Sequence, residues 1–247
     1  MRYCEKCGHI LIEKELEKEG KIPYCPICKE FRFPTFNSAI STIIFNKEKN
    51  KILLIQQYGN PHNILVAGYI NKGENAKEAL CREVQEEVGI DLAFYEYNDN
   101  AYFEKSNTLI HNYTSIAKSE EFTINDEVDK AKWYSIEEAI NVIKPNSLAK
   151  QFLLQTLHKQ GFTRKLLHYE ENRIYILDAY DHIIAEITFP AKEDTCEIDH
   201  TFVDPSLRGM GIASILVEEA RNYILSKNKI PVPICSYAVK WFEKHAT

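Results

Sequence analysis

The 247-residue sequence predicts an α+β and α/β chain in three parts: a metal-held ribbon, an α+β unit and a smaller α/β unit. Two pairs of cysteines are confined to the first 34 residues, which have little apolar periodicity. From Phe36 onward, β-branched runs with the period of strands alternate with helical stretches. Gly161 marks a break before a second group of strands and helices. With 45% hydrophobic and 27% charged residues, the composition is that of a folded chain rather than a disordered one.

The charge balance and the cysteine count exclude several classes of protein. The net charge of −6 disfavours a broad nucleic-acid-binding surface, although it leaves a local basic patch open. No apolar run approaches the ~20 residues of a membrane helix, so no membrane partner is expected. The first residues have no apolar signal core, which predicts a cytoplasmic protein. Seven cysteines in such a chain indicate metal binding or chemistry rather than disulfides, with Cys81 and Cys196 expected to be packing residues.

The first part is predicted to be a zinc ribbon over residues 1–34. Cys4 and Cys7 form one C-x-x-C knuckle, and Cys25 and Cys28 form another after 17 intervening residues. Each pair can place two thiolates on one tight turn, and four thiolates satisfy tetrahedral Zn²⁺. A redox dithiol would need a C-x-x-C that opens a helix, and neither pair does so. A structural role is expected because so short a segment cannot build a core without metal.

The second part is expected to contain the elements that its periodicity predicts. The strands are placed at 38–46, 51–57, 63–67, 92–97, 109–117 and 131–134, and the helices at 76–88, 135–143 and 147–159. A polar tetrapeptide at 47–50 predicts a hairpin between the first two strands. Ser135, followed three residues later by Glu138, is a capping box that predicts the start of the second helix.

The predicted helix 76–88 carries a cluster of acidic residues. Glu83, Glu86 and Glu87 are spaced i, i+3, i+4, so their carboxylates project from one helical face. Three like charges on one face repel each other, and a bound divalent cation removes that repulsion. Carboxylate oxygens are hard ligands, which suit Mg²⁺ or Mn²⁺.

The loop before this helix completes the pattern. Gly68 permits a backbone carbonyl to turn toward the metal, and Arg82 can pair with Glu74 and fix the loop against the helix. The spacing of Gly68, Glu74 and the run from Arg82 to Ile90 resembles the Nudix box at every defined position. The resemblance implies an α/β/α sandwich with a mixed sheet over residues 35–161. It also implies hydrolysis of a nucleoside diphosphate derivative to a nucleoside monophosphate by metal-activated water.

The same resemblance implies roles for individual residues. The catalytic set is Glu74, Arg82, Glu83, Glu86 and Glu87, and the metal set is Gly68, Glu83, Glu86, Glu87 and Glu127. Glu83 matches the position often assigned the general base. Glu127 precedes an Ala-x-Trp element and is the candidate for an additional ligand, with a surface charge as the alternative. Glu120 and Glu121 are alternative candidates for the general base.

A four-cysteine ribbon ahead of a Nudix domain looks like the NADH pyrophosphatase group, which also acts on NAD and removes NAD caps from RNA. The Trp- and Pro-rich element of that group is missing from the corresponding stretch at 102–110. An NAD(H)-like dinucleotide, ADP-ribose and a nucleotide sugar therefore remain as candidate substrates. Tyr69, Tyr102 and Phe103 either stack on a base or belong to the core. A homodimer is allowed by the resemblance alone.

The third part is expected to contain a glycine-rich turn between a strand and a helix. Strands are placed at 173–179, 182–189, 197–203 and 230–235, and helices at 212–226 and 237–244. The turn holds Arg208, Gly209 and Gly211 directly before the helix at 212–226. Free amide N–H groups and the helix dipole at such a turn favour the phosphates of a diphosphate.

The run at 201–213 looks like the acetyl-CoA motif of the GNAT acetyltransferases. This implies a compact GNAT-like α/β domain over residues 162–247. The implied acetyl-CoA-binding residues are Phe202, Val203, Arg208, Gly209, Met210, Gly211, Ile212 and Ala213. Cys235 matches a Cys-x-Tyr/Phe feature of the small GNAT-like subgroup, which suggests an acetyl acceptor. A structural cysteine is the alternative.

The leading hypothesis is a Mg²⁺- or Mn²⁺-dependent Nudix diphosphatase acting on a small nucleotide, with an acetyl-CoA-binding second domain. One alternative is an acetyltransferase whose Nudix domain senses a nucleotide. Another is a decapping factor for NAD-capped RNA, in which the ribbon grips the nucleic acid.

Overall fold

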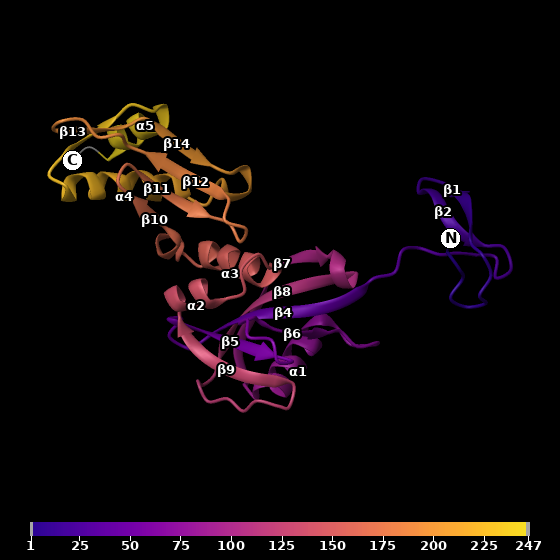
Figure 1. The fold of residues 1–247 in the computed structure, drawn as a ribbon. Helices are drawn as coiled ribbons and strands as arrows, with labels where there is room; N and C mark the ends of the chain where they lie inside the picture. Colours follow the sequence, from indigo (N-terminus) through magenta and orange to yellow (C-terminus); the bar gives the residue numbers. More distant parts are fainter. Residues whose placement is uncertain (1, 246–247) are drawn as a thin grey trace.

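The computed structural model describes residues 2–245, which form three parts along the chain (Figure 1). In the ribbon, β1 (Ile12–Leu16), β2 (Gly20–Cys25) and β3 (Glu30–Phe31) make a three-stranded antiparallel sheet. Within residues 2–34 only Cys4, Pro23 and Cys25 are buried. Thiol groups rather than a set of apolar side chains therefore occupy the centre of the ribbon. An extended segment separates the ribbon from the rest of the molecule (Figure 1).

The central part is built on a mixed six-stranded sheet. Its strands are β4 (Asn37–Phe45), β5 (Lys51–Gln57), β6 (Val66–Tyr69), β7 (Leu92–Phe103), β8 (Thr108–Ala117) and β9 (Val128–Ser135). They run in the order β7-β8-β4-β5-β9, with β6 paired to β4. The β4–β8 pair is parallel and the others are antiparallel, so the predicted mixed sheet is confirmed.

Three helices cover the two faces of this sheet (Figure 1). They are α1 (Ala76–Val88), α2 (Ile136–Val142) and α3 (Leu148–Lys159). Alternate residues of β4 point to opposite faces, because Ile44 packs in the core with α1 whereas Ile43 packs in the core with α2 and α3. The α/β/α sandwich expected of this part is therefore present, and the predicted capping box of Ser135 and Glu138 begins α2.

The C-terminal part has two small sheets and two helices. One sheet is antiparallel, in the order β10 (His168–Glu170), β11 (Arg173–Leu177), β12 (Ile183–Thr188) and β14 (His200–Val203). The other is the parallel pair of β13 (Thr195–Ile198) and β15 (Ile230–Pro233). The helices α4 (Ile212–Ser226) and α5 (Ser236–Lys244) complete this part.

Several strand bounds differ from the prediction, since the strand expected at 92–97 runs to Phe103 and the one expected at 173–179 ends at Leu177. Two further differences concern the pairing of strands. The expected strand at 197–203 is broken at Asp199, because β13 pairs with β15 and β14 pairs with β12. Residues 63–67 are only partly a strand, since β6 begins at Val66, while Asn63 and Ile64 form isolated bridges to Ile143 and Ile55. Both differences arise from the choice of partner strand, which is not a local property of the sequence.

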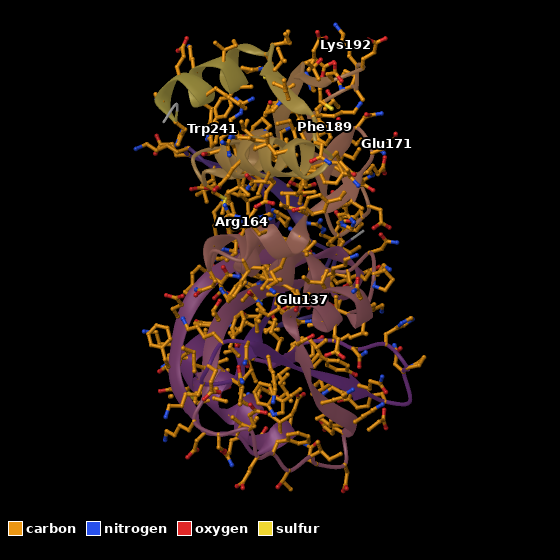
Figure 2. The ribbon with its side chains drawn as sticks, turned by 90° about the vertical axis from the view of Figure 1, so that its left-hand side faces the viewer. Glu137, Arg164, Glu171, Phe189, Lys192 and Trp241 are labelled. Atoms are coloured by element: carbon orange, nitrogen blue, oxygen red, sulfur yellow. The ribbon has the colours of Figure 1, made fainter. Side chains whose placement is uncertain are left out.

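The central and C-terminal parts share one hydrophobic core. Leu157 of α3 and Ile174 of β11 are fully buried members of the same cluster. The connection between the two parts is held at both ends, because Lys165 forms an ion pair with Glu137 of α2, and Arg164 bonds Glu219 of α4. Figure 2 shows Arg164 at this junction, between Glu137 and Phe189. Within residues 2–245, no helix has the length and apolar character needed to cross a membrane.

The shared core also contains a histidine. His158 of α3 is 6% exposed, and its Nδ1 lies 3.2 Å from Thr163 Oγ1. Its Nε2 has no hydrogen-bond partner among the described residues. Burial lowers the pKa of His158 from its ordinary 6.5 to about 4, because the charged imidazolium loses its hydration.

This burial predicts a loss of stability in acid. Between pH 6.5 and 4 the unfolded chain binds a proton at His158 that the folded chain does not, so the free energy of unfolding falls as the pH falls. By pH 4.5 the loss from this group is about 2.5 kcal/mol. Urea unfolding at pH 7 and pH 4.5 should show that a His158→Gln variant loses less stability than the wild type by this amount. Equal losses in the two proteins would contradict the prediction.

Candidate active site

Gly68 lies in direct contact with the acidic helix. It pairs with Ile40 across the β4–β6 ladder, which carries its backbone over α1. A Cβ atom added at Gly68 would lie 1.9 Å from Glu83 Cδ. A Cβ atom would overlap the carboxylate of Glu83, so glycine at position 68 leaves room for this side chain against the strand. Leu80 and Val84 of α1 are fully buried against the sheet, as predicted, and they fix the direction in which Glu83 projects.

Arg82 connects the loop to the helix through its guanidinium group. Its Nε and Nη2 bind the Oε1 and Oε2 of Glu74 at 2.8 and 2.9 Å. This bidentate pair, which the sequence predicts, lowers the pKa of Glu74 to about 2. Nη1 donates to Glu83 Oε1 at 2.7 Å and to Glu86 Oε2 at 3.0 Å, and Nη2 donates to the carbonyl of Tyr69 at 2.9 Å. The guanidinium group of Arg82 thus binds three carboxylates and the end of β6.

Glu87 is the buried member of the cluster, with 3% of its surface exposed. Gln57 Nε2 donates to its Oε1 at 2.6 Å, while its Oε2 has no partner among the described residues. Burial, together with the charges of Glu83 and Glu127, raises the pKa of Glu87 to about 7. A buried carboxylate with an unpaired oxygen is destabilising unless a cation meets it.

Glu127 joins the cluster from the loop that precedes β9. Asn125 Oδ1 accepts from the backbone N–H of Glu127 at 3.0 Å, and Tyr58 Oη donates to Glu127 Oε2 at 3.3 Å. Its charge acts on both Glu83 and Glu87. Glu120 lies elsewhere, at the β4–β5 turn, where it pairs with Lys51 Nζ at 2.7 Å.

Two residues that contact the cluster were missed by the sequence analysis. Gln57 ends β5, and Tyr58 follows it with a left-handed backbone, at a φ of 55°. They reach Glu87 and Glu127 through the pairing of β5 with β9, which a single sequence does not display. The unusual conformation of Tyr58 is a signal of the structure alone.

The carboxylate set fits a divalent cation in its chemistry. Carboxylates are hard oxygen donors, and the buried oxygen of Glu87 is unpaired among the described residues, which suits Mg²⁺ or Mn²⁺. The ligand atoms are not gathered to one point, because Arg82 holds Glu83 and Glu86, and Glu86 is half exposed. Binding of a cation therefore requires these side chains to turn toward it.

The four cysteines of the ribbon lie close together, in contrast to the carboxylates. Their Sγ atoms all lie within 4.8 Å of one another, the one such group of three or more ligands found within residues 2–245. Cys4 and Cys28 are 3.8 Å apart, and Cys7 and Cys25 are 3.5 Å apart. Four thiols from two knuckles fit a tetrahedral zinc ion. Cys81 is exposed, so its prediction as a packing residue is wrong, whereas Cys196 is buried as expected.

The C-terminal part has a wedge where its two sheets separate. Ile198 O accepts from the backbone N–H groups of both Ile234 and Cys235 at 2.9 Å, and beyond this point β14 leaves toward β12. Cys235 lies at this apex, with its Sγ 3.3 Å from Thr201 Oγ1. The same sulfur accepts from Ala238 N and caps α5. Cys235 is half-buried, which leaves both the structural and the acceptor interpretation open.

The glycine turn follows β14, as the sequence predicts. Gly209 and Gly211 have φ values of 80° and 74°, a region in which other residues are strained. Gly211 stands at the N-cap of α4 without a side-chain cap, so the first N–H groups of the helix are available to a ligand. The other motif residues divide by burial, with Phe202 and Arg208 exposed, Val203, Met210 and Ala213 half-buried, and Ile212 buried.

This arrangement of sheet, acidic helix and glycine defines the class of the central part. Residues 35–155 match the NUDIX domain family, and residues 173–247 match the family of GCN5-related N-acetyl-transferases. The chain thus contains a Nudix domain and a GNAT-like acetyltransferase domain behind a zinc-ribbon-like cysteine cluster.

The relatives by sequence are proteins named as NAD-capped RNA hydrolases. The chain is 22% identical over 153 residues to the NAD-capped RNA hydrolase NudC of Pseudomonas aeruginosa. The matched region covers 62% of this chain and 54% of that protein. It is 26% identical over 159 residues to NudC of Escherichia coli, covering 63% and 60% of the two chains. The NAD-capped RNA hydrolase ndx-9 of Caenorhabditis elegans is 27% identical over 177 residues, covering 68% and 45%. The chain therefore spans about half the length of these curated relatives.

The fold also matches a solved structure. A NUDIX hydrolase from Nitrosomonas europaea superposes with a TM-score of 0.51 at 18% identity, covering 65% of this chain and 94% of that one. This likeness concerns the fold of the Nudix domain.

The cysteine geometry predicts zinc in the ribbon. Purified protein should contain about one zinc ion per chain, and Cys25→Ser should lose it, because three thiolates and a water bind Zn²⁺ more weakly than four thiolates. Cys81→Ser, which changes a cysteine outside the cluster, should keep the metal. Native mass spectrometry measures the content, and limited proteolysis should show residues 2–34 cut first in Cys25→Ser. Equal zinc in both variants would rule out the four-cysteine site.

Proposed function

We propose that the chain is a Nudix diphosphatase that requires Mg²⁺ or Mn²⁺ and cleaves a nucleoside diphosphate derivative to a nucleoside monophosphate. The observation that carries the proposal is the unpaired, buried oxygen of Glu87 inside a carboxylate cluster that contacts Gly68. The names of the relatives, NAD-capped RNA hydrolases, support an NAD-like group as substrate. We assign residues 35–161 to this domain, 1–34 to the ribbon and 162–247 to the GNAT-like domain.

The proposed active-site residues form two groups, the metal ligands and the residues that position these ligands. Glu83, Glu86, Glu87, Glu127 and the Gly68 carbonyl are the proposed ligands. When bound, the metal neutralises the diphosphate and lowers the pKa of water. Glu74 and Arg82 orient the helix against the loop, as their bidentate contact supports. Glu83, at the contact with Gly68, is the proposed general base for the attacking water.

The candidate substrates follow from the stretch at 102–110. That stretch lacks the Trp- and Pro-rich element of the NADH pyrophosphatases, so ADP-ribose and nucleotide sugars stand beside NADH and NAD as candidate substrates. NAD-capped RNA is a larger candidate with the same diphosphate. A net charge of −6 favours the small nucleotides over RNA.

The proposal predicts metal-dependent cleavage that single substitutions abolish. With Mg²⁺ or Mn²⁺, at least one of NADH, NAD, ADP-ribose and a nucleotide sugar should yield a nucleoside monophosphate, seen by chromatography. Glu87→Gln and Gly68→Ala should each lower kcat by about 100-fold or more, since one removes a charge at the metal and the other displaces Glu83.

The matched control is Glu78→Gln, on the same helix, because glutamine still completes the capping box of α1. This variant should keep wild-type kcat. Cleavage that continues unchanged in Glu87→Gln, or that proceeds fully in a chelator, would overturn the proposed function.

A second function is proposed for the C-terminal domain, which we expect to bind acetyl-CoA. The glycine turn at the uncapped start of α4 and the apex of the wedge at Cys235 support it. Arg208 and the amides of residues 209–213 would meet the pyrophosphate, while Phe202 and Val203 would line the edge along β14. Cys235 is the proposed acetyl acceptor. An acetyltransferase regulated by a nucleotide in the Nudix domain is the alternative to two independent activities.

Calorimetry tests this second function. The wild type should bind acetyl-CoA, and Arg208→Ala should weaken binding about tenfold, since it removes a charged contact with phosphate. Arg221→Ala, an exposed arginine farther along α4, should bind like the wild type. Mass spectrometry after incubation should find an acetyl group on Cys235 and none in Cys235→Ser. A wild type that binds no acetyl-CoA would refute the assignment.

A further inference from the structure

A cleft of about 570 Å³ opens in the Nudix domain, on the face of the sheet that α3 covers. Its floor is apolar and includes Leu65, Ile110 and Phe152. Ala67 also lines it, and the next residue along β6 is Gly68, against which Glu83 packs. The cleft has the size of a small-molecule site. Because successive residues of a strand point to opposite faces, the cleft lies across β6 from the carboxylate of Glu83.

The chemistry of the cleft favours a flat ring that carries phosphate. Tyr102 and Phe103 contribute aromatic rings from the end of β7, and the ring of Tyr102 is half exposed. Lys105 and Lys144 add positive charge at the same cleft. An apolar floor with aromatic rings can bind the heterocyclic base of a nucleotide, and lysines can bind the phosphates of the same nucleotide. This combination selects a nucleotide over a sugar phosphate or an inorganic phosphate.

One wall of the cleft comes from the other domain. Tyr180 lies in the β11–β12 turn of the GNAT-like domain, and its side chain is 45% exposed. The turn is internally fixed, because Asp178 Oδ1 accepts from the backbone N–H groups of Tyr180 and His182 at 2.8 and 2.9 Å. Asp178 N also donates to His182 O at 2.9 Å, which closes the turn.

The same turn is docked on the Nudix domain. Asn146 N donates to Ala179 O at 3.1 Å, and Lys150 Nζ lies 3.9 Å from Asp181 Oδ1. Ala179 is 2% exposed and belongs to the core that both domains share. The position of Tyr180 at the cleft is therefore set by contacts between the domains rather than by the conformation of a free loop.

We propose that Tyr180 is a substrate-binding residue of the Nudix reaction, and that its ring packs on the heterocyclic base of the nucleoside diphosphate derivative. The GNAT-like domain then completes the cleft in which the Nudix domain holds its substrate. This inference rests on the proposed hydrolase function for the identity of the ligand. In this proposal Tyr180 binds and selects the base of the substrate, and it takes no part in the chemical step.

Three full-length variants test the proposal. Tyr180→Ala removes the ring, Tyr180→Phe keeps it, and His182→Ala changes an exposed residue of the same turn that does not line the cleft. KM and kcat are measured with the cleaved substrate and Mg²⁺, and calorimetry measures the binding of AMP and of nicotinamide mononucleotide. Tyr180→Ala should raise KM and the Kd of one mononucleotide about tenfold, with kcat within about twofold, because a stacked base loses its partner. Tyr180→Phe and His182→Ala should behave like the wild type.

The outcomes separate this proposal from the hydrolase function. Wild-type KM and Kd in Tyr180→Ala, alongside active cleavage, would overturn the role of Tyr180 and leave the hydrolase standing. An equal loss in Tyr180→Phe would also overturn it, because this variant keeps the ring. A wild type that cleaves nothing but binds a mononucleotide in a manner dependent on Tyr180 would support the role and refute the hydrolase. A wild type that neither cleaves nor binds would overturn both.

Discussion

The contact between Gly68 and the carboxylate of Glu83 is the constraint on which the candidate active site depends. It brings the backbone of β6 against the acidic face of α1, at a separation that excludes even a methyl group. Burial of Leu80 and Val84 in the sheet fixes the rotation of the helix, and Arg82 then ties Glu74, Glu83 and the carbonyl of Tyr69 together. A side chain at position 68 would overlap the carboxylate of Glu83, which would have to turn away and would lose its contact with Arg82.

Arg82 leaves the cluster incompletely neutralised. It contacts Glu74, Glu83 and Glu86, whereas the described residues that hydrogen-bond Glu87 are neutral, namely the amide of Gln57 and the backbone of Ala67. The charges of Glu83 and Glu127 add to the effect of burial on the pKa of Glu87, about 7, so part of the metal-free protein is protonated there near neutral pH. A cation that binds Glu87 must displace this proton, and metal affinity is therefore coupled to pH. The protein retains a destabilising charge at a place where a ligand can compensate for it.

The sequence predicts the parts of this site that are local. The bounds of α1, β5 and α4 follow from periodicity and from caps, and the pairing of Arg82 with Glu74 follows from spacing. Gln57 and Tyr58 could not be found in this way, because β5 brings them to the cluster through long-range pairing. The break at Asp199 was missed for the same reason, since each half of that strand has the alternation of a continuous one and only the partner strands differ. The strands of the ribbon were missed because their centre is made of thiols and not of an apolar face.

Because the two domains share one hydrophobic core, they are not independent units joined by a linker. Domains tied by a flexible linker keep separate stabilities and separate sites. Here α3 packs in one cluster with the sheets of both domains, and the connecting segment is paired with α2 on one side and α4 on the other. A displacement of the GNAT-like domain therefore moves the β11–β12 turn and the α2–α3 loop that line the Nudix cleft. The two domains are thus joined by packed contacts at the Nudix cleft itself, which a chain of independent domains does not possess.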